Sequence, residues 1–269
     1  MKIKVPYIMA ASVLAVITPA AHAAYTFSGL SITENFNTMP TSTVAGVFSA
    51  TNGVQAAISG TGFVGTKLSG TNTTTAIALT ADNGSGNSGG LYSYGAATVA
   101  ERAVGATASG TNIMGFGFEV VNGGSDTITE ITISLTQENW RTSTTTVNTF
   151  ASSYAVGAAG STSFLSAATG FTAASALSLV GPAVVASNGL IDGNLAINQV
   201  ARSLTISGLT ILAGESFYLR WQDVNDAGND AALAVDDLSL TFVTAAVPEP
   251  QAAALLGVVG LLGIFRRRR

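Results

Sequence analysis

The chain has 269 residues, enough for one large domain or two small ones, and only 10% of them are charged. It has no cysteine and a single histidine, His22, so disulfides, thiol catalysis and metal sites built on several histidines are excluded. Between residues 24 and 250 there are 15 acidic residues and five basic ones, and this net charge of −10 excludes the positive surface that nucleic-acid binding requires.

A secretory signal peptide is predicted over residues 1–23. Two lysines near the start precede an apolar run at residues 5–17, which is too short to span a hydrocarbon core of ~30 Å comfortably. Ala21 and Ala23 give the small-x-small pattern of a cleavage site before Ala24. We therefore expect export through the Sec translocon. An N-terminal anchor helix is the alternative.

The exported part, residues 24–244, shows alternation of apolar and polar side chains, which is the period of half-buried strands. The alternation is clearest over residues 114–121, 131–136, 204–206 and 217–222. Turn pairs such as Asn-Gly separate these runs, and no window of 12 or more residues has a helical period. We predict an all-β domain, an antiparallel β-sandwich, with the jelly roll of lectins and carbohydrate-binding modules as the favoured arrangement.

Three stretches lack this alternation. Residues 69–90 and 105–112 are rich in Gly, Ser, Thr and Asn, and we predict that they are loops. Residues 151–186 are the least patterned, and long loops or a short helix are expected there.

Two carboxylates fall in phase with apolar neighbours, so they are expected to point inward. They are Glu34, near the start of the domain, and Asp236, in its last predicted strand. A buried carboxylate without a partner costs several kcal/mol. If the first and last strands are adjacent, Glu34 and Asp236, together with Asp237, could hold a structural calcium ion. The Val-Asp-Asp sequence here resembles the ending and calcium site of carbohydrate-binding jelly rolls. Pairing with Arg202 or Arg220, or with backbone donors, is the alternative.

An acidic turn, residues 223–230, joins the last two predicted strands. It does not match an EF-hand, because Ala227 and Ala234 occupy the fifth and twelfth positions, where that loop supplies ligands. We interpret it as a solvated Asn/Asp/Gly hairpin loop, with calcium binding as the minor alternative.

Two tryptophans could form a sugar-stacking surface, together with Tyr92 and Tyr94. Trp221 alternates with core positions, whereas Trp140 follows a polar run at a strand end and is the better candidate for an exposed ring that stacks on a ligand. Glutamates that could serve a two-carboxylate glycosidase are present, but none lies in the E-x-D-x-E pattern of jelly-roll glycosidases. We therefore predict no catalytic residues and no enzymatic activity.

The C-terminal segment, residues 245–269, has three parts in a fixed order. The first is a stiff, proline-containing motif: Val247, Pro248, Glu249 and Pro250. The second is an uncharged run at residues 251–265, which as a helix is about 22 Å long and predicts a single short transmembrane helix. The third is a basic tail expected to stay cytoplasmic: Arg266, Arg267, Arg268 and Arg269.

This order resembles the PEP-CTERM sorting signal of Gram-negative bacteria. The resemblance covers about 23 of the 269 residues. It implies recognition and cleavage near Pro-Glu-Pro by an exosortase, transient anchoring in the inner membrane, and delivery to the cell surface or exopolysaccharide matrix. A plain tail anchor is the alternative interpretation of the segment.

Three functions are compatible with these features. The favoured one is a non-enzymatic surface or matrix protein that is sorted by its tail. The second is a secreted carbohydrate-binding module with a structural calcium ion and a polysaccharide ligand. The third, and least favoured, is a glycosidase-like enzyme.

Overall fold

The computed structural model describes residues 23–29, 31–185 and 189–247. Within these ranges the chain forms β-strands and two short 3-10 helices, η1 at Ser175–Leu177 and η2 at Ala196–Asn198. The prediction of an all-β domain is therefore confirmed. Nearly all of the predicted signal peptide, and the predicted tail from Pro248 onward, lie outside the described residues.

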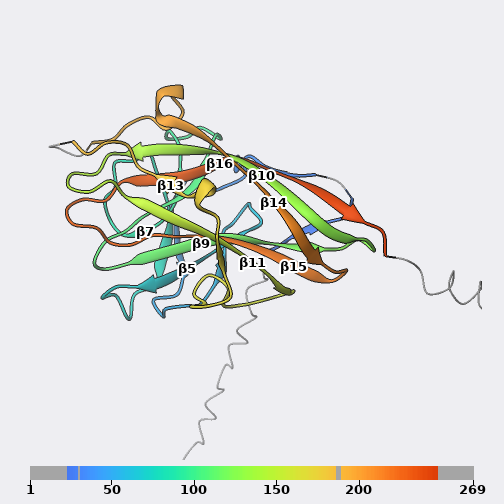
Figure 1. The fold of residues 1–269 in the computed structure, drawn as a ribbon. Coiled ribbons are helices and arrows are strands. Elements are labelled where there is room, and N and C mark those ends of the chain that lie inside the picture. The colour runs from blue at the N-terminus through green and yellow to red at the C-terminus, as the bar shows by residue number, and fades with distance from the viewer. Residues whose placement is uncertain (1–22, 30, 186–188, 248–269) are drawn as a thin grey trace, which may run out of the picture.

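Two sheets stack face to face, with β10, β14 and β16 in one layer and β5, β9, β11 and β15 in the other (Figure 1). In the described residues, the first sheet has eight strands in the order β12-β11-β15-β9-β5-β4, with β1 beside β9 and β13 beside β11. Its strands are β1 (Tyr25–Phe27), β4 (Ala56–Ala57), β5 (Phe63–Ser69), β9 (Ile113–Asn122), β11 (Thr149–Ala158), β12 (Thr172–Ala173), β13 (Leu179–Val180) and β15 (Glu215–Gln222).

The second sheet, counted over the same residues, also has eight strands, in the order β14-β10-β16-β8-β7-β6-β3, with β2 beside β16. Its strands are β2 (Ile32–Glu34), β3 (Val44–Phe48), β6 (Ile77–Asp82), β7 (Gly90–Tyr94), β8 (Ala103–Thr107), β10 (Thr127–Arg141), β14 (Gln199–Ile211) and β16 (Ala232–Ala245). Most pairs are antiparallel, as predicted, but β1 pairs with β9, and β6 with β7, in parallel.

The main core fills the space between the sheets with aromatic and branched side chains from alternate strand positions. Trp221 is fully buried there, as its alternation predicts, and its ring stacks on Phe116 with centroids 5.5 Å apart. Its Nε1 donates to the carbonyl oxygen of Leu177 in η1, at 2.8 Å, so burying the indole leaves no unsatisfied donor.

The last strand, β16, changes phase at a β-bulge. Asp236 pairs with Thr136 of β10, whereas Ser239 pairs with Ser134, so β16 has one residue more than its partner between these pairs. Asp237, inside the bulge, has a φ of 47°. The extra residue means that alternation cannot be carried from one side of the bulge to the other.

This bulge overturns the prediction that Asp236 is in phase with the apolar residues of its strand and points inward with them. Leu233, Val235 and Leu238 belong to the core between the sheets. Ala234 belongs instead to a smaller cluster on the opposite face of the second sheet, and Asp236 follows it by one strand period. Asp236 therefore points to this outer face and not into the main core.

Candidate functional site

The outer face of the second sheet has a small core of its own, made by Tyr92, Tyr94, Ala103, Trp140, Ala232 and Ala234. The rings of Tyr92 and Tyr94 stack with centroids 4.9 Å apart, and Tyr94 stacks on Trp140 at 5.9 Å. Loops cover this cluster. Arg141 holds one of them, because its Nη1 donates to the carbonyl oxygens of residues 84–86.

Trp140 is buried by these loops, which contradicts the prediction of an exposed, sugar-stacking ring. Only 2% of its surface is exposed. A Cβ built on Gly193 would lie 2.4 Å from the indole, so that residue's backbone packs directly on the ring. Sequence reasoning missed this cover because it comes from segments far from Trp140 in the chain.

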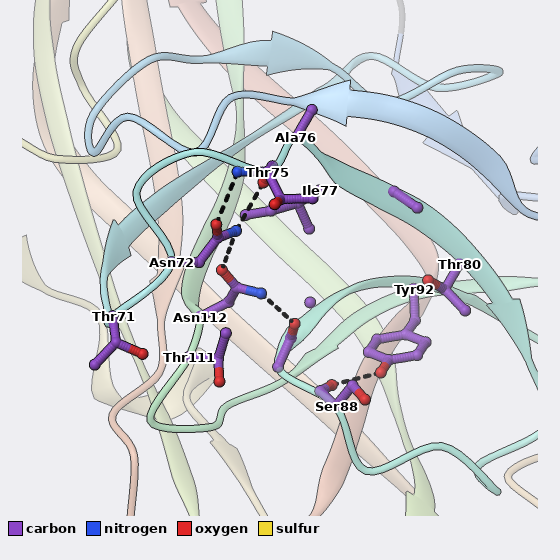
Figure 2. A pocket seen from close by; sticks show the side chains of 13 residues that line it. Thr71, Asn72, Thr75, Ala76, Ile77, Thr80, Ser88, Tyr92, Thr111 and Asn112 are labelled. Carbon is purple, nitrogen blue, oxygen red and sulfur yellow. Dashed lines mark hydrogen bonds between the residues drawn. The ribbon is translucent and has the colours of Figure 1, made fainter.

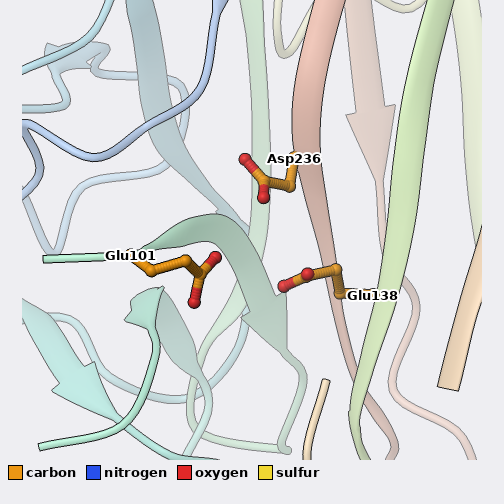
Figure 3. Close-up of side chains that lie close together, drawn as sticks. All are labelled: Glu101, Glu138 and Asp236. Carbon is orange, nitrogen blue, oxygen red and sulfur yellow. The ribbon is translucent and has the colours of Figure 1, made fainter. Parts of the chain in front are cut away.

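Three carboxylates converge, and we call them the acidic cluster: Glu101, Glu138 and Asp236 (Figure 3). The cluster lies beside Trp140, whose Nε1 donates to Glu138. Glu138 is on β10, Asp236 is on the adjacent β16, and Glu101 lies just before β8, the next strand along. Glu138 pairs with Ala234, so it lies diagonally across from Asp236 on the same face. One oxygen of each carboxylate lies within 4.8 Å of the others.

Burial and mutual repulsion dominate the electrostatics of the acidic cluster. Burial raises the pKa of Glu138 to about 7, and the nearby charge of Glu101 adds to this, while hydrogen bonds from Trp140 and Gln199 oppose it. Burial likewise raises the pKa of Asp236 to about 8. A backbone hydrogen bond from Asp237 opposes this increase, whereas the charges of Glu138, Asp237 and Glu101 add to it. These carboxylates are therefore poised to take up a proton or a cation.

The residues predicted to bind calcium separate into two places. The first and last strands do lie close, since Glu34 of β2 pairs with Leu238 of β16. Glu34 and Asp237 line a hollow of about 300 Å³, whereas Asp236 belongs to the acidic cluster. Glu34 accepts hydrogen bonds from the Tyr25 hydroxyl and the Phe36 amide, both at 3.0 Å. The predicted trio does not form one site.

The arginines suggested as partners for those acids bond elsewhere. Nε and Nη2 of Arg202 donate to Oε1 of Gln137, at 3.1 and 2.8 Å. Nη1 of Arg220 donates to the carbonyl oxygens of Phe164 and Ala167, both at 2.8 Å. Arg202 therefore links two neighbouring strands of the second sheet, whereas Arg220 ties a loop to the first sheet.

The acidic turn, residues 223–230, is less solvated than predicted. Its tip is exposed, but Asp223 and Asp230 at its two ends are each only 4% exposed. Nδ2 of Asn148 donates to Asp226, at 2.6 Å, and to Asp230, at 3.1 Å. Burial raises the pKa of Asp223 to about 8 and that of Asp230 to about 6.

A polar groove of about 500 Å³ lies where β6 and β7 meet the turn before β9 (Figure 2). Asn72 donates to Asn112 at 3.1 Å, and Asn112 donates to the carbonyl oxygen of Gly89 at 3.1 Å. The other lining residues are mostly threonine, alanine, serine and glycine, and none of the lining residues is acidic or basic. The groove therefore offers neutral hydrogen-bonding groups, and no sequence motif marked it.

Comparisons with known proteins give little similarity. No family model and no curated protein matches the chain. Among solved structures, the carbohydrate-binding module TmCBM61, in complex with β-1,4-galactotriose, is similar with a TM-score of 0.28 and 9% identity, over 55% of this chain and 74% of that chain. At this level of similarity, the ligand of TmCBM61 carries no argument about the ligand of this chain.

Proposed function

We propose that this chain is an exported, non-enzymatic protein of the cell surface or exopolysaccharide matrix, with a sandwich of the jelly-roll type. Its C-terminal segment would be a PEP-CTERM sorting signal, which an exosortase recognises in the inner membrane. The observation that carries the proposal is the order of the tail: the Val-Pro-Glu-Pro motif, an uncharged run and four arginines.

The bounds of the sandwich support this proposal. The first strand begins at Tyr25, one residue after the predicted signal-peptide cut, and β16 ends at Ala245, two residues before the proline motif begins. Cleavage at both predicted positions would therefore leave every strand of the two sheets in place. The processed protein would keep its hydrogen-bonded ladders and its core.

Replacing Pro248, Glu249 and Pro250 together by alanine tests the proposal. We expect uncut protein to accumulate in the membrane fraction, because the exosortase would no longer recognise the segment. Mass spectrometry of protein recovered from cells reports both cuts at once. The control is V243A/T244A, which alters the exposed end of β16 and should be processed normally. Normal release of the triple variant, or intact chain dissolved in the cytosol, would contradict the proposal.

Glycan binding is the second candidate, and the neutral polar groove favours it. Amide, hydroxyl and backbone groups of this kind hydrogen-bond to sugar hydroxyls. The described aromatic side chains are all buried or partly buried, so a glycan there would be held by hydrogen bonds more than by ring stacking. A glycan array probed with the purified protein separates a defined glycan receptor from a purely structural matrix protein.

A glycosidase remains the least favoured function. The groove has no carboxylate in its lining, and two of the three carboxylates of the acidic cluster are buried under loops. Hydrolysis of labelled polysaccharides that is lost in E138Q would overturn the non-enzymatic proposal.

A further inference from the structure

We propose that Glu101, Glu138 and Asp236 bind a divalent cation of the calcium type, and that this ion stabilises the second sheet. One oxygen from each side chain lies within 4.8 Å of the others. Calcium binds oxygen ligands at about 2.3–2.6 Å, so an ion between the three carboxylates could reach all of them. The inference is independent of how the protein is sorted.

Unpartnered oxygens are the second observation that points to a ligand. Asp236 is only 7% exposed, yet its Oδ1 has no hydrogen-bond partner. Both carboxylate oxygens of Glu101 are also buried and lack a partner. A buried carboxylate oxygen without a donor is costly, and in the described part of the chain three such oxygens belong to one cluster.

Glu138, in contrast, is held in place by donors. Its Oε2 accepts from Nε1 of Trp140 at 3.0 Å, and its Oε1 accepts from Nε2 of Gln199 at 2.9 Å. Each oxygen keeps a second acceptor position, so these bonds orient the carboxylate without saturating it. Such support from neighbouring groups is what a preformed metal ligand requires.

The adjacent basic side chain, Arg102, interacts with Glu101 through its charge but donates no hydrogen bond to the cluster. Arg102 follows Glu101 in sequence, but its Nη2 donates to the carbonyl oxygen of Ala96 at 3.1 Å, and its Nη1 points at the carbonyl oxygen of Ser93 at 3.5 Å. Three ionised carboxylates carry a charge of −3, which one divalent ion would reduce to −1. Protonation is the other way to lower this charge, and a change in stability that depends on calcium distinguishes the two.

The donor set selects the class of ion. It consists of carboxylate oxygens, with no nitrogen or sulfur, which suits hard cations and not zinc or copper. Calcium accepts six to eight oxygens in irregular geometry, whereas magnesium demands a near-octahedral shell. Because the ligands come from β10, from β16 and from the residues just before β8, the ion would hold three neighbouring parts of the second sheet together.

Thermal unfolding of the full-length protein near neutral pH, in EGTA, in calcium or in magnesium, tests the inference. At about 100 times its Kd, calcium should raise the Tm of a chain this size by about 5–10 °C, and magnesium should raise it less. E138Q and D236N should each abolish the shift. D236N should also raise the Tm in EGTA, because it removes a repelling charge whose Oδ1 has no hydrogen-bond partner. Isothermal titration should give one calcium ion per chain, lost in both variants.

Two further variants keep the test decisive. E101Q alters a partly exposed position outside the strands, so it should fold even where the buried variants do not, and it too should weaken the shift. D237N removes the adjacent, exposed carboxylate and should keep the full shift. Equal melting temperatures in calcium and EGTA would overturn the inference and leave protonation as the source of neutrality. A shift that persists in all three cluster variants would overturn it as well, because the ion would then bind elsewhere.

Discussion

Asp237 has a φ of 47°, in the left-handed region, at the bulge of β16. This conformation costs most residues roughly 1–2 kcal/mol, whereas glycine adopts it freely and Asp tolerates it. We expect D237G to be as stable as the wild type, or slightly more so, and D237V to lose roughly 1–2 kcal/mol. Urea unfolding of the two variants measures this. Equal losses in both would mean that the Asp237 side chain, and not its backbone conformation, is what the bulge requires.

Single residues also show why the acidic cluster could be only partly predicted. The sequence marks Asp236 as a carboxylate in a strand, but nothing local reveals that one extra residue at position 237 reverses its face. Glu101 lies outside any strand and has no periodic signal. Trp140 is covered by loops that join it only in the folded chain, so its burial could not be read from its polar neighbours.

At the scale of elements, alternation predicts the central strands well and the less regular ones poorly. The four runs that alternate most clearly fall in β9, β10, β14 and β15. In contrast, β6 lies inside the stretch predicted as a loop at residues 69–90, and β11 begins the stretch predicted as long loops or a short helix. These strands are rich in small or polar side chains, and their backbone pairing depends on distant partners.

The loop between β6 and β7 packs against β10 so closely that a methyl group cannot be added. Gly84 has a φ of 93°, and a Cβ there would lie 1.9 Å from the carbonyl oxygen of Trp140. We expect G84A to lose roughly 1–3 kcal/mol of stability, from overpacking and an unfavourable φ. G110A is the matched control, because a Cβ at Gly110 meets nothing within 4 Å, and it should stay within about 0.5 kcal/mol of the wild type. Urea unfolding compares the two, and equal effects would contradict the packing argument.

At the scale of the whole molecule, the acidic turn is one of the connections between the two sheets. Residues 223–230 connect β15 of the first sheet to β16 of the second, and Asn148, just before β11, bonds to the turn. Asp223 and Asp230 are ordinary aspartates in the unfolded chain but retain their protons to about pH 8 and about pH 6 in the folded one. Between about pH 4 and these values, the folded state binds protons that the unfolded state has released.

Linkage then fixes the direction in which the stability of the whole sandwich changes with pH. Because the folded protein binds more protons, its free energy of unfolding should fall as pH rises from about 4 to about 8. We expect Tm, measured in EGTA by circular dichroism, to decline over this window. D223N should remove part of the decline, and Glu138 and Asp236, whose pKa values are raised to about 7 and about 8, contribute the rest. D237N alters an exposed aspartate in β16, the strand that follows the acidic turn, and it should leave most of the slope. A Tm that rises with pH, or a D223N slope equal to that of the wild type, would show that the acidic turn opens to solvent and that its carboxylates ionise without loss of stability.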